Sequence, residues 1–229
     1  MKYEIIGSDM QHLKVTLQQG EKIYADSGML VSKSQNIVMT PKLVGGIISA
    51  LERKATGATA MLTEFTPKDG EGIVSVAGVF PGKVFQLTLG EGERFTIERY
   101  SFLAADSTVK YTIQMMNIGA AVFAGSGFYL QELVGPGNVF VHVVGDVIMH
   151  TVSDQEPVEI EPGHVAGFDS NLKYKVRFVD NIRTAMFGGV GLFLAKFEGN
   201  GRLLTHSVSR FKLSSEMYTL GKEQQQNKK

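Results

Sequence analysis

The chain reads NIGAAVFAGSGFYLQELVGPGNVFVHVV over residues 117–144 and NIRTAMFGGVGLFLAKFEGNGRLLTHSV over residues 181–208. The two stretches align without a gap at an offset of 64, and eleven of the 28 aligned positions are identical. The identical pairs are Asn117/Asn181, Ile118/Ile182, Ala121/Ala185, Phe123/Phe187, Gly125/Gly189, Gly127/Gly191, Leu130/Leu194, Gly135/Gly199, Gly137/Gly201, His142/His206 and Val144/Val208. Ordinary residue usage would give about two. This duplication predicts a fold built from copies of one supersecondary unit.

The duplication extends upstream of this stretch. Residues 93–113 match residues 156–176 at an offset of 63, and a fainter third copy opens the chain at residues 21–23. We therefore expect one compact β domain over residues 1–215. Its three repeats would cover about 1–90, 91–153 and 154–215.

Each repeat has the pattern of β-strands. Phe95 and Ile97, and then Val139, Val141 and Val143, alternate at period two, and glycine- and proline-rich turns separate such runs. Gly135/Gly199 and Gly137/Gly201 are explained if their turns need a positive φ. Two segments differ from this pattern. Residues 47–54 are the main helical candidate, and the polar residues 216–229 are expected to be a disordered tail.

Composition excludes several classes of function. The chain has 23 basic and 23 acidic residues, so no basic excess favours a nucleic-acid partner. It has no cysteine, which excludes disulfides, a thiolate nucleophile and zinc sites of the cysteine type. The first 15 residues interleave charged and apolar side chains, unlike a signal peptide. These features together lead us to expect a cytoplasmic protein.

One segment resembles a membrane span by length. Residues 111–131 are 21 consecutive uncharged residues, about enough to cross a bilayer. The copy of this segment at residues 175–195 contains Arg177, Asp180 and Arg183. Because charge is costly in hydrocarbon, a buried sheet is the better interpretation.

The pattern of Gly-x-Gly, an apolar strand, Leu-x-Gly-x-Gly and a second apolar strand resembles the altered-inheritance-of-mitochondria protein 24 family. The matching stretches are residues 125–137 and, more loosely, 189–201, whereas the first repeat departs from the pattern at residues 66–72. The resemblance covers about residues 1–215. It implies an all-β fold of three repeated β-sandwich units with pseudo-threefold symmetry. That fold is similar to the tryptophan RNA-binding attenuation protein (TRAP-like) and to a double-stranded β-helix. It implies no catalytic motif.

Five histidines are candidates for acid–base or metal chemistry: His12, His142, His150, His164 and His206. The equivalent pair His142 and His206 is the sharpest candidate. No carboxylate stands at ligand spacing from either, so we expect no metal site. The alternative is that both side chains face solvent or bond a neighbouring backbone.

The repeated pairs Lys110-Tyr111 and Lys173-Tyr174 follow Asp106-Ser107 and Asp169-Ser170. One hypothesis is a repeated anion site formed by the ammonium and phenol groups. The simpler interpretation is structural. Asp-Ser starts a turn by bonding its own backbone, lysine faces water and tyrosine covers the core.

Other motifs fail to meet a known pattern. Ser126 between Gly125 and Gly127 is not a nucleophile elbow, since Ala124 and Phe128 flank it. The chain has no phosphate-binding loop of the form Gly-x-x-x-x-Gly-Lys-[Ser/Thr]. RNA binding rests only on the fold analogy, and fold similarity does not transfer function.

We therefore expect a scaffold or binding protein rather than an enzyme, acting through protein or membrane-surface contacts, with no catalytic residue, metal or cofactor. Surplus apolar strand surface favours a homo-oligomer, for which a trimer is one possibility. The alternative is a small-ligand binder or enzyme with a site between repeats. Such a site would use residues that differ between copies: 45–57, 66–72, His150 and His164.

Overall fold

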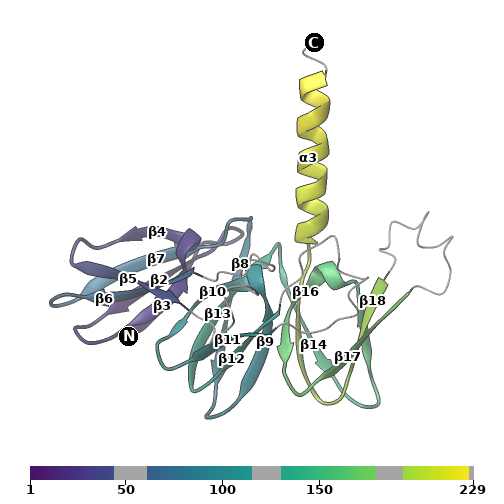
Figure 1. Cartoon of the computed structure of the whole chain (residues 1–229), viewed down its shortest axis with the longest axis horizontal. Coiled ribbons are helices and arrows are strands. Elements are labelled where there is room, and N and C mark those ends of the chain that lie inside the picture. The colour runs from purple at the N-terminus through teal and green to yellow at the C-terminus, as the bar shows by residue number, and fades with distance from the viewer. Residues whose placement is uncertain (44–60, 115–129, 179–192, 227–229) are drawn as a thin grey trace.

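The computed structural model of the chain describes residues 1–43, 61–114, 130–178 and 193–226 (Figure 1). Within these residues the fold is all-β, apart from three 3-10 turns and one α-helix, which confirms the all-β part of the predicted fold class.

The elements before residue 80 are β1 (Lys2–Ile6), β2 (His12–Leu17), β3 (Ile23–Asp26), η1 (Ser27–Met29), β4 (Leu30–Lys33), β5 (Ile37–Leu43), β6 (Met61–Pro67) and β7 (Gly72–Ala77). The middle of the chain forms β8 (Gly82–Leu89), β9 (Arg94–Glu98), η2 (Arg99–Ser101), β10 (Phe102–Asp106), β11 (Lys110–Gln114), β12 (Leu130–Val134) and β13 (Gly137–Val144). The last part forms β14 (Val147–Val152), β15 (Val158–Ile160), η3 (Pro162–His164), β16 (Val165–Asp169), β17 (Lys173–Phe178), β18 (Phe193–Glu198), β19 (Gly201–His206) and α3 (Arg210–Gln226).

The strands form four antiparallel sheets. Sheet A has the order β1-β2-β7-β4, and sheet D has the order β15-β18-β17. Sheets B and C have six strands each, in the orders β5-β6-β3-β10-β13-β8 and β11-β12-β9-β16-β19-β14.

The sheets cross the predicted repeat boundaries. In sheet B, β3 pairs with β10 so that Ala25 lies opposite Ala104, and in sheet C, β9 pairs with β16 so that Ile97 lies opposite Gly167. The two middle sheets therefore combine strands from successive predicted repeats, and the four sheets form one stack. Shared sheets satisfy backbone groups that separate sandwiches would leave at open edges.

Three apolar cores lie between successive sheets. Leu13, Val15 and Val76 of sheet A pack with Phe65 and Phe140 of sheet B. The opposite face of sheet B packs on sheet C, and the far face of sheet C packs on sheet D. Strands buried on both faces explain why runs such as 139–144 are apolar at almost every position.

Local features recur along the stack. The strand orders β4-β7-β2, β10-β13-β8 and β16-β19-β14 are the same, and each 3-10 turn leads into a strand with a β-bulge. Asp26 caps η1 by accepting from the Gly28 N–H at 3.0 Å, and Glu98 caps η2 by accepting from the Tyr100 N–H at 3.0 Å. We call the end of the sheets that carries these 3-10 turns the helix end, and the opposite end the turn end.

The C-terminal segment differs from its prediction. Residues 210–226 form α3, which rises from the helix end (Figure 1), instead of the disordered tail expected from residue 216 onward. The segment is polar, but Lys, Glu, Gln, Leu and Met are good helix formers and no proline interrupts them. Low hydrophobicity thus prevented packing on the sheets without preventing a helix. The helical candidate at 47–54 lies outside the described residues.

The predicted positive φ is confirmed for only two of the four turn glycines. Gly137 and Gly199 have φ of 142° and 107°, whereas Gly135 and Gly201 do not have positive φ. At Gly135 the reason is space, because a Cβ would come within 2.3 Å of the Gly90 carbonyl oxygen.

Candidate functional site

A polar cleft opens at the turn end of sheet C. Its volume is about 470 Å³. The turn before β9, the strands β9 and β12, and the β16–β17 turn contribute its lining: Gly92, Glu93, Arg94, Glu132, Asp169, Ser170 and Asn171.

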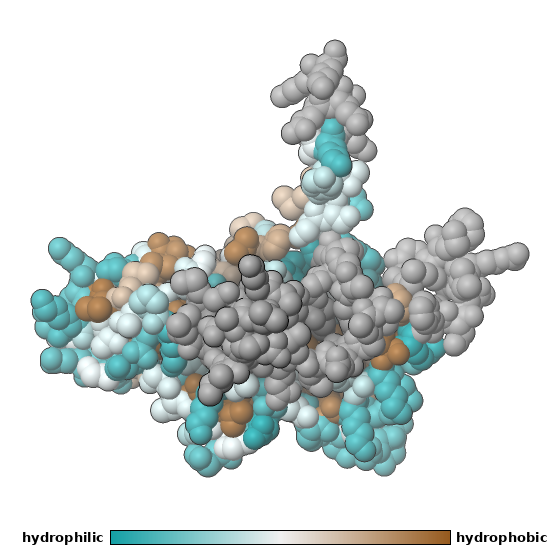
Figure 2. Space-filling model, in the orientation of Figure 1, coloured by the Kyte–Doolittle hydropathy of each residue, from teal (hydrophilic) through white to brown (hydrophobic). Residues whose placement is uncertain are grey.

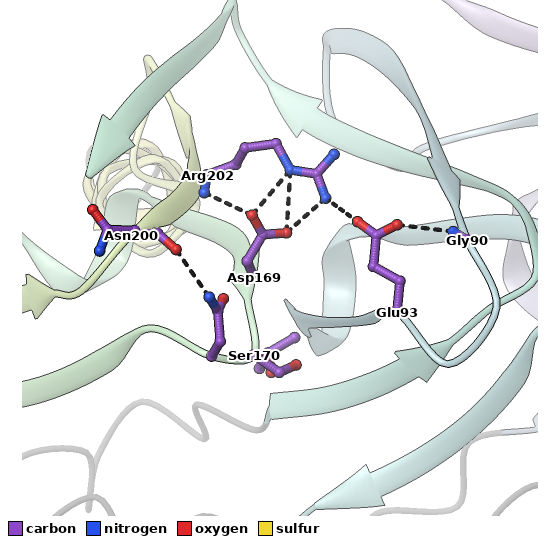
Figure 3. Close-up of polar contacts among 8 residues, drawn as sticks. Gly90, Glu93, Asp169, Ser170, Asn200 and Arg202 are labelled. Atoms are coloured by element: carbon purple, nitrogen blue, oxygen red, sulfur yellow. Dashed lines mark hydrogen bonds and ion pairs between the residues drawn. The ribbon is translucent and has the colours of Figure 1, made fainter. Parts of the chain in front are cut away.

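Arg202 of β19 joins the two sides of this cleft (Figure 3). Its backbone N–H donates to Asp169 Oδ2 at 2.7 Å, and its Nη2 donates to Asp169 Oδ1 at 2.7 Å and to Glu93 Oε1 at 2.5 Å. The hydrogen bonds from Arg202 to Asp169 raise the pKa of the guanidinium above its usual value. Glu93 is held in turn by the Gly90 N–H, which donates to Oε2 at 2.8 Å. The arginine therefore ties the β8–β9 turn to the β16–β17 turn.

The remaining polar groups of the cleft are also satisfied. Arg94 Nη1 donates to Glu132 Oε2 at 2.7 Å, and the hydroxyls of Thr96 and Ser170 lie 2.8 Å apart. Every charged side chain that lines the cleft is thus in an ion pair. The described residues of its lining include neither histidine nor cysteine.

The neighbouring sheet has a related arrangement at the same end. In sheet B, Asp106 Oδ2 accepts from the Asn138 N–H at 2.8 Å, and Tyr3 donates its hydroxyl to Asp106 Oδ1. The N-terminal ammonium of Met1 pairs with Glu21. Burial and the Asp106 hydrogen bond raise the pKa of the Tyr3 phenol. In sheet A, Ser34 accepts from the Ile73 N–H at 2.9 Å. A contact that recurs three times is typical of a structural brace.

These contacts change the interpretation of the repeated Asp-Ser turns. The turns close through backbone carbonyls, with Val109 N–H donating to Asp106 O and Leu172 N–H donating to Asp169 O, both at 3.0 Å. The two carboxylates do not bond their own backbone as predicted. Instead they accept hydrogen bonds from the neighbouring strand of the sheet: Asp106 from the Asn138 N–H and Asp169 from the Arg202 N–H.

The Lys-Tyr pairs fit the structural interpretation. Lys110 and Lys173 are exposed, whereas Tyr111 is buried and Tyr174 half-buried. Tyr111 meets Phe102 edge-on, and burial raises the pKa of Tyr174 to about 12. The lysines therefore face water, as expected.

The equivalent histidines His142 and His206 are both buried. His206 Nδ1 accepts from the Val144 N–H at 3.0 Å, and its Nε2 lies 3.3 Å from Ser101 Oγ. Burial lowers the pKa of His206 to about 3, and it lowers that of His142 against an opposing hydrogen bond with the Phe80 backbone. Of the two expected alternatives, backbone bonding is correct and solvent exposure is wrong.

The other histidines also have structural partners. His150 Nε2 lies 3.1 Å from Thr205 Oγ1, and His164 Nδ1 lies 2.8 Å from the His206 carbonyl oxygen. His12 lies in β2 opposite Ala77. Within the described parts of the chain, no three His, Asp or Glu side chains are placed to hold a metal ion.

The segments that differ between copies give a mixed result. Residues 66–72 form the end of β6 and a turn in which Asn36 Nδ2 donates to the Asp69 carbonyl oxygen at 2.7 Å. Residues 45–57 and the 125–127 motif lie outside the described residues.

The sequence did not single out Arg202 or Glu132. Both occupy positions where the second and third copies differ. Arg202 of the third copy aligns with Asn138 of the second, and Glu132 of the second copy aligns with Lys196 of the third. That difference was the available signal.

No helix among the described residues is both long and apolar enough to span a membrane. Residues 110–114 and 130–134, at the two ends of the uncharged segment, are the strands β11 and β12, as expected for a sheet.

Comparison with known proteins agrees with this architecture. A crystal structure of a Streptococcus pyogenes protein is similar over 96% of this chain and 99% of that one, with a TM-score of 0.77 and 21% sequence identity. An uncharacterized protein of Streptococcus pyogenes serotype M6 is 24% identical over 204 residues, which cover 86% of this chain and 81% of that protein. The sequence profile of the family described as mitochondrial biogenesis AIM24 matches residues 3–208. The chain therefore belongs to the mitochondrial biogenesis AIM24 family.

Proposed function

We propose that this protein works by binding rather than by catalysis, and that α3 is its contact with a protein partner. The observation that carries the proposal is a stripe of exposed apolar residues on α3. This helix stands clear of the sheets (Figure 2).

The base of α3 is firmly attached. Arg210 Nη2 donates to Glu98 Oε1 at 2.8 Å, where the Glu98 side chain is only 3% exposed, and the Arg210 guanidinium lies 3.8 Å from the centre of the Tyr100 ring. Lys212 Nζ pairs with Glu161 Oε2 at 2.8 Å. A fixed base orients the rest of the helix, which reduces the entropy lost when a partner binds.

The stripe consists of Leu213, Met217 and Leu220, which follow the i, i+4, i+7 spacing of one helix face. Met217 is 61% exposed and Leu220 is 57% exposed, and Tyr218 beside them is 65% exposed. An apolar helix face with these spacings is the usual ligand of a hydrophobic groove in another protein.

The chemistry of α3 favours a protein partner over a membrane surface. Helices that lie in a membrane interface have a basic polar face and a broad apolar face. α3 has three basic residues against the two acidic residues Glu216 and Glu223, and three consecutive glutamines follow at 224–226. A stripe three residues long suits a groove better than a bilayer.

We also infer that the fold consists of three copies of one unit with pseudo-threefold symmetry, as in TRAP-like folds. The matching strand orders, the three 3-10 turns with their bulges, and the braces at Ser34, Asp106 and Asp169 support this. A rigid repeated body with a projecting helix suits a scaffold.

The cleft at the turn end favours a second candidate, a small-ligand binder with a site between repeats. Its volume of about 470 Å³ would hold a small polar molecule. Its charged groups already pair with each other, so a ligand would have to replace those ion pairs. We therefore rank this function second.

Site-specific photo-crosslinking in the native host tests the α3 contact. A photoreactive residue at Met217 should form discrete protein adducts, whereas the same residue at Ser215, on the opposite face of α3, should not. Leu220→Asp should abolish the Met217 adducts by placing a charge in the groove. Lipid adducts alone, or equal protein adducts from both faces, would contradict the proposal.

A further inference from the structure

The edges of the four sheets differ in charge. Native edge strands usually carry charged residues or proline, which oppose pairing with another chain. Among the described strands, seven of the eight sheet edges carry such a charge: Lys2 and Glu4 in β1, Lys33 in β4, Lys42 in β5, Lys83 in β8, Lys110 in β11, Glu159 in β15 and Lys173 in β17. The exception is β14, with the sequence VIMHTV.

The strand β14 is also more exposed than its counterparts. In the matching strand orders, β2, β8 and β14 hold the same place. The outer edge of β2 is covered by β1, whose Glu4 lies opposite Lys14. The start of the β8 edge is closed by Gln11, which donates its N–H to Gly82 O and accepts from the Val84 N–H, both at 2.9 Å. Within the described chain, no strand pairs with the outer edge of β14.

The side chains along β14 fit a buried position. Ile148 is 43% exposed and Met149 is 48% exposed, and no charged residue lies between Val147 and Val152. The inner edge of β14 is fully paired with β19, from Val147 opposite His206 to Val152 opposite Gly201. The strand is therefore in register with β19 along its whole length, without a bulge, which makes its outer edge a suitable template for a further strand.

We propose that the outer edge of β14 pairs antiparallel with β14 of a second copy of this chain. The same edge of β2 is covered by an antiparallel strand, β1, so the fold itself shows which structure fits there. If β14 paired instead with any other described edge strand of a second copy, a strand that carries a charged residue would lie against Ile148 and Met149. Two β14 strands meet without any charge, and a two-fold axis makes both contacts identical.

The register follows from the alternation of the backbone. The backbone N–H of Val84 in β8 points outward from the sheet edge, where it donates to Gln11. Val147 is the equivalent residue of β14, because Val84 lies opposite His142 and Val147 lies opposite the equivalent His206. Val147, Met149 and Thr151 therefore present their backbone groups to the outer edge. Residues opposite each other must share a face, and the register centred on Met149 pairs all three of these residues. In it Met149 meets Met149 of the second copy, and Val147 meets its Thr151. This pairing joins the two six-stranded C sheets into one.

This interface does not depend on the proposed role of α3, because α3 projects from the helix end and β14 lies on a sheet edge. Failure of one proposal leaves the other untouched.

Sedimentation velocity of the full chain over a dilution series tests the interface. The wild-type particle should have twice the chain mass of 25.0 kDa. Met149→Lys should reduce it to the mass of one chain, since like charges would meet on the two-fold axis. Gln86→Lys is the matched control, because exposed Gln86 holds the same place on β8, and it should leave the mass unchanged.

A mixture of Met149→Lys and Met149→Glu chains should restore the two-chain particle, whereas each variant alone should stay single. Circular dichroism of each variant checks that it is folded. A wild-type particle of one or three chains, or a two-chain particle that persists in Met149→Lys, would overturn the proposal.

Discussion

Asp169 has the strongest brace among the residues at the turn end. Its carboxylate accepts from the backbone N–H of Arg202 and from the guanidinium, and its side chain is only 15% exposed. Glu93 binds the same guanidinium at the rim, where its side chain is 40% exposed. The two acids share a partner but differ in burial, which makes them a matched pair.

Asp169→Ala should therefore lower the free energy of unfolding by about 1.5–3 kcal/mol, because it leaves a backbone N–H and a guanidinium without their acceptor. Glu93→Ala should cost no more than about 1 kcal/mol, as an exposed ion pair does. Urea unfolding measures both. Equal small losses would show that the brace contributes nothing to stability.

His206 should make stability depend on pH. Its folded pKa is about 3, below the usual 6.5. Between these values the unfolded chain binds a proton that the folded chain does not, so stability falls as the pH drops from about 6.5 toward 3.

His206→Asn should remove this dependence, reducing by about 2 kcal/mol the stability lost between pH 7 and pH 5. The depressed pKa of His142 acts in the same direction and should leave a smaller residual slope. Denaturant unfolding at the two pH values measures the difference. An unchanged slope in the variant would show that His206 is not buried as a neutral group.

At the scale of single residues, the sequence could not show which residue each side chain contacts. The repeat pattern marked Asp106, Asp169 and the two equivalent histidines, and each of them has a hydrogen-bond partner within the fold. It could not show that Asp169 bonds Arg202, because that contact joins strands whose pairing depends on the assembled sheet. A carboxylate after a strand looks the same whether it closes its own turn or reaches the next strand.

Among the elements, α3 stands apart because it touches the sheets only near its base. Deletion of residues 214–229 should change the free energy of unfolding by less than about 0.5 kcal/mol, as changes at exposed sites do. Arg210→Ala should cost about 3 kcal/mol, because it strips the nearly buried Glu98 of a cationic partner. Guanidinium unfolding compares the two variants. A large loss on deletion would place the stripe of α3 against the sheets.

Element prediction was good for strands and poor for this helix. Period-two runs such as Phe95/Ile97 and Val139/Val141/Val143 predicted β9 and β13, because strands that face a core show it in their alternation. The last 17 residues of the described chain have too few apolar side chains to pack on the sheets. Polarity alone does not distinguish an isolated exposed helix from a disordered tail.

At the scale of the whole molecule, the shared sheets should make unfolding cooperative. Phe140 is fully buried between sheets A and B, with its ring 4.9 Å from that of Tyr3. Phe140→Ala should cost about 3–5 kcal/mol and still give a single transition, because sheet B continues through β3 and β10. Tyrosine fluorescence and circular dichroism should report the same midpoint. Two separate transitions would mean that the repeats unfold independently.

The overall arrangement was only partly predictable. The offsets of 63 and 64 indicated copies of one strand-rich unit. They could not show that strands from different copies pair, since β3–β10 and β9–β16 contacts link residues about 70–80 positions apart and leave no local pattern. The predicted repeats thus share sheets, and the described strands form one stack of four sheets.

The central claim is that this stack works through its surfaces and not through a bound ligand. Native mass spectrometry of the protein purified from its own host tests that claim directly. The account predicts a particle whose mass equals the sum of its polypeptides, with no constant excess for each chain. A metabolite, lipid or metal retained in a fixed ratio to the chain would contradict it and point back to the cleft beside Glu93, Asp169 and Arg202.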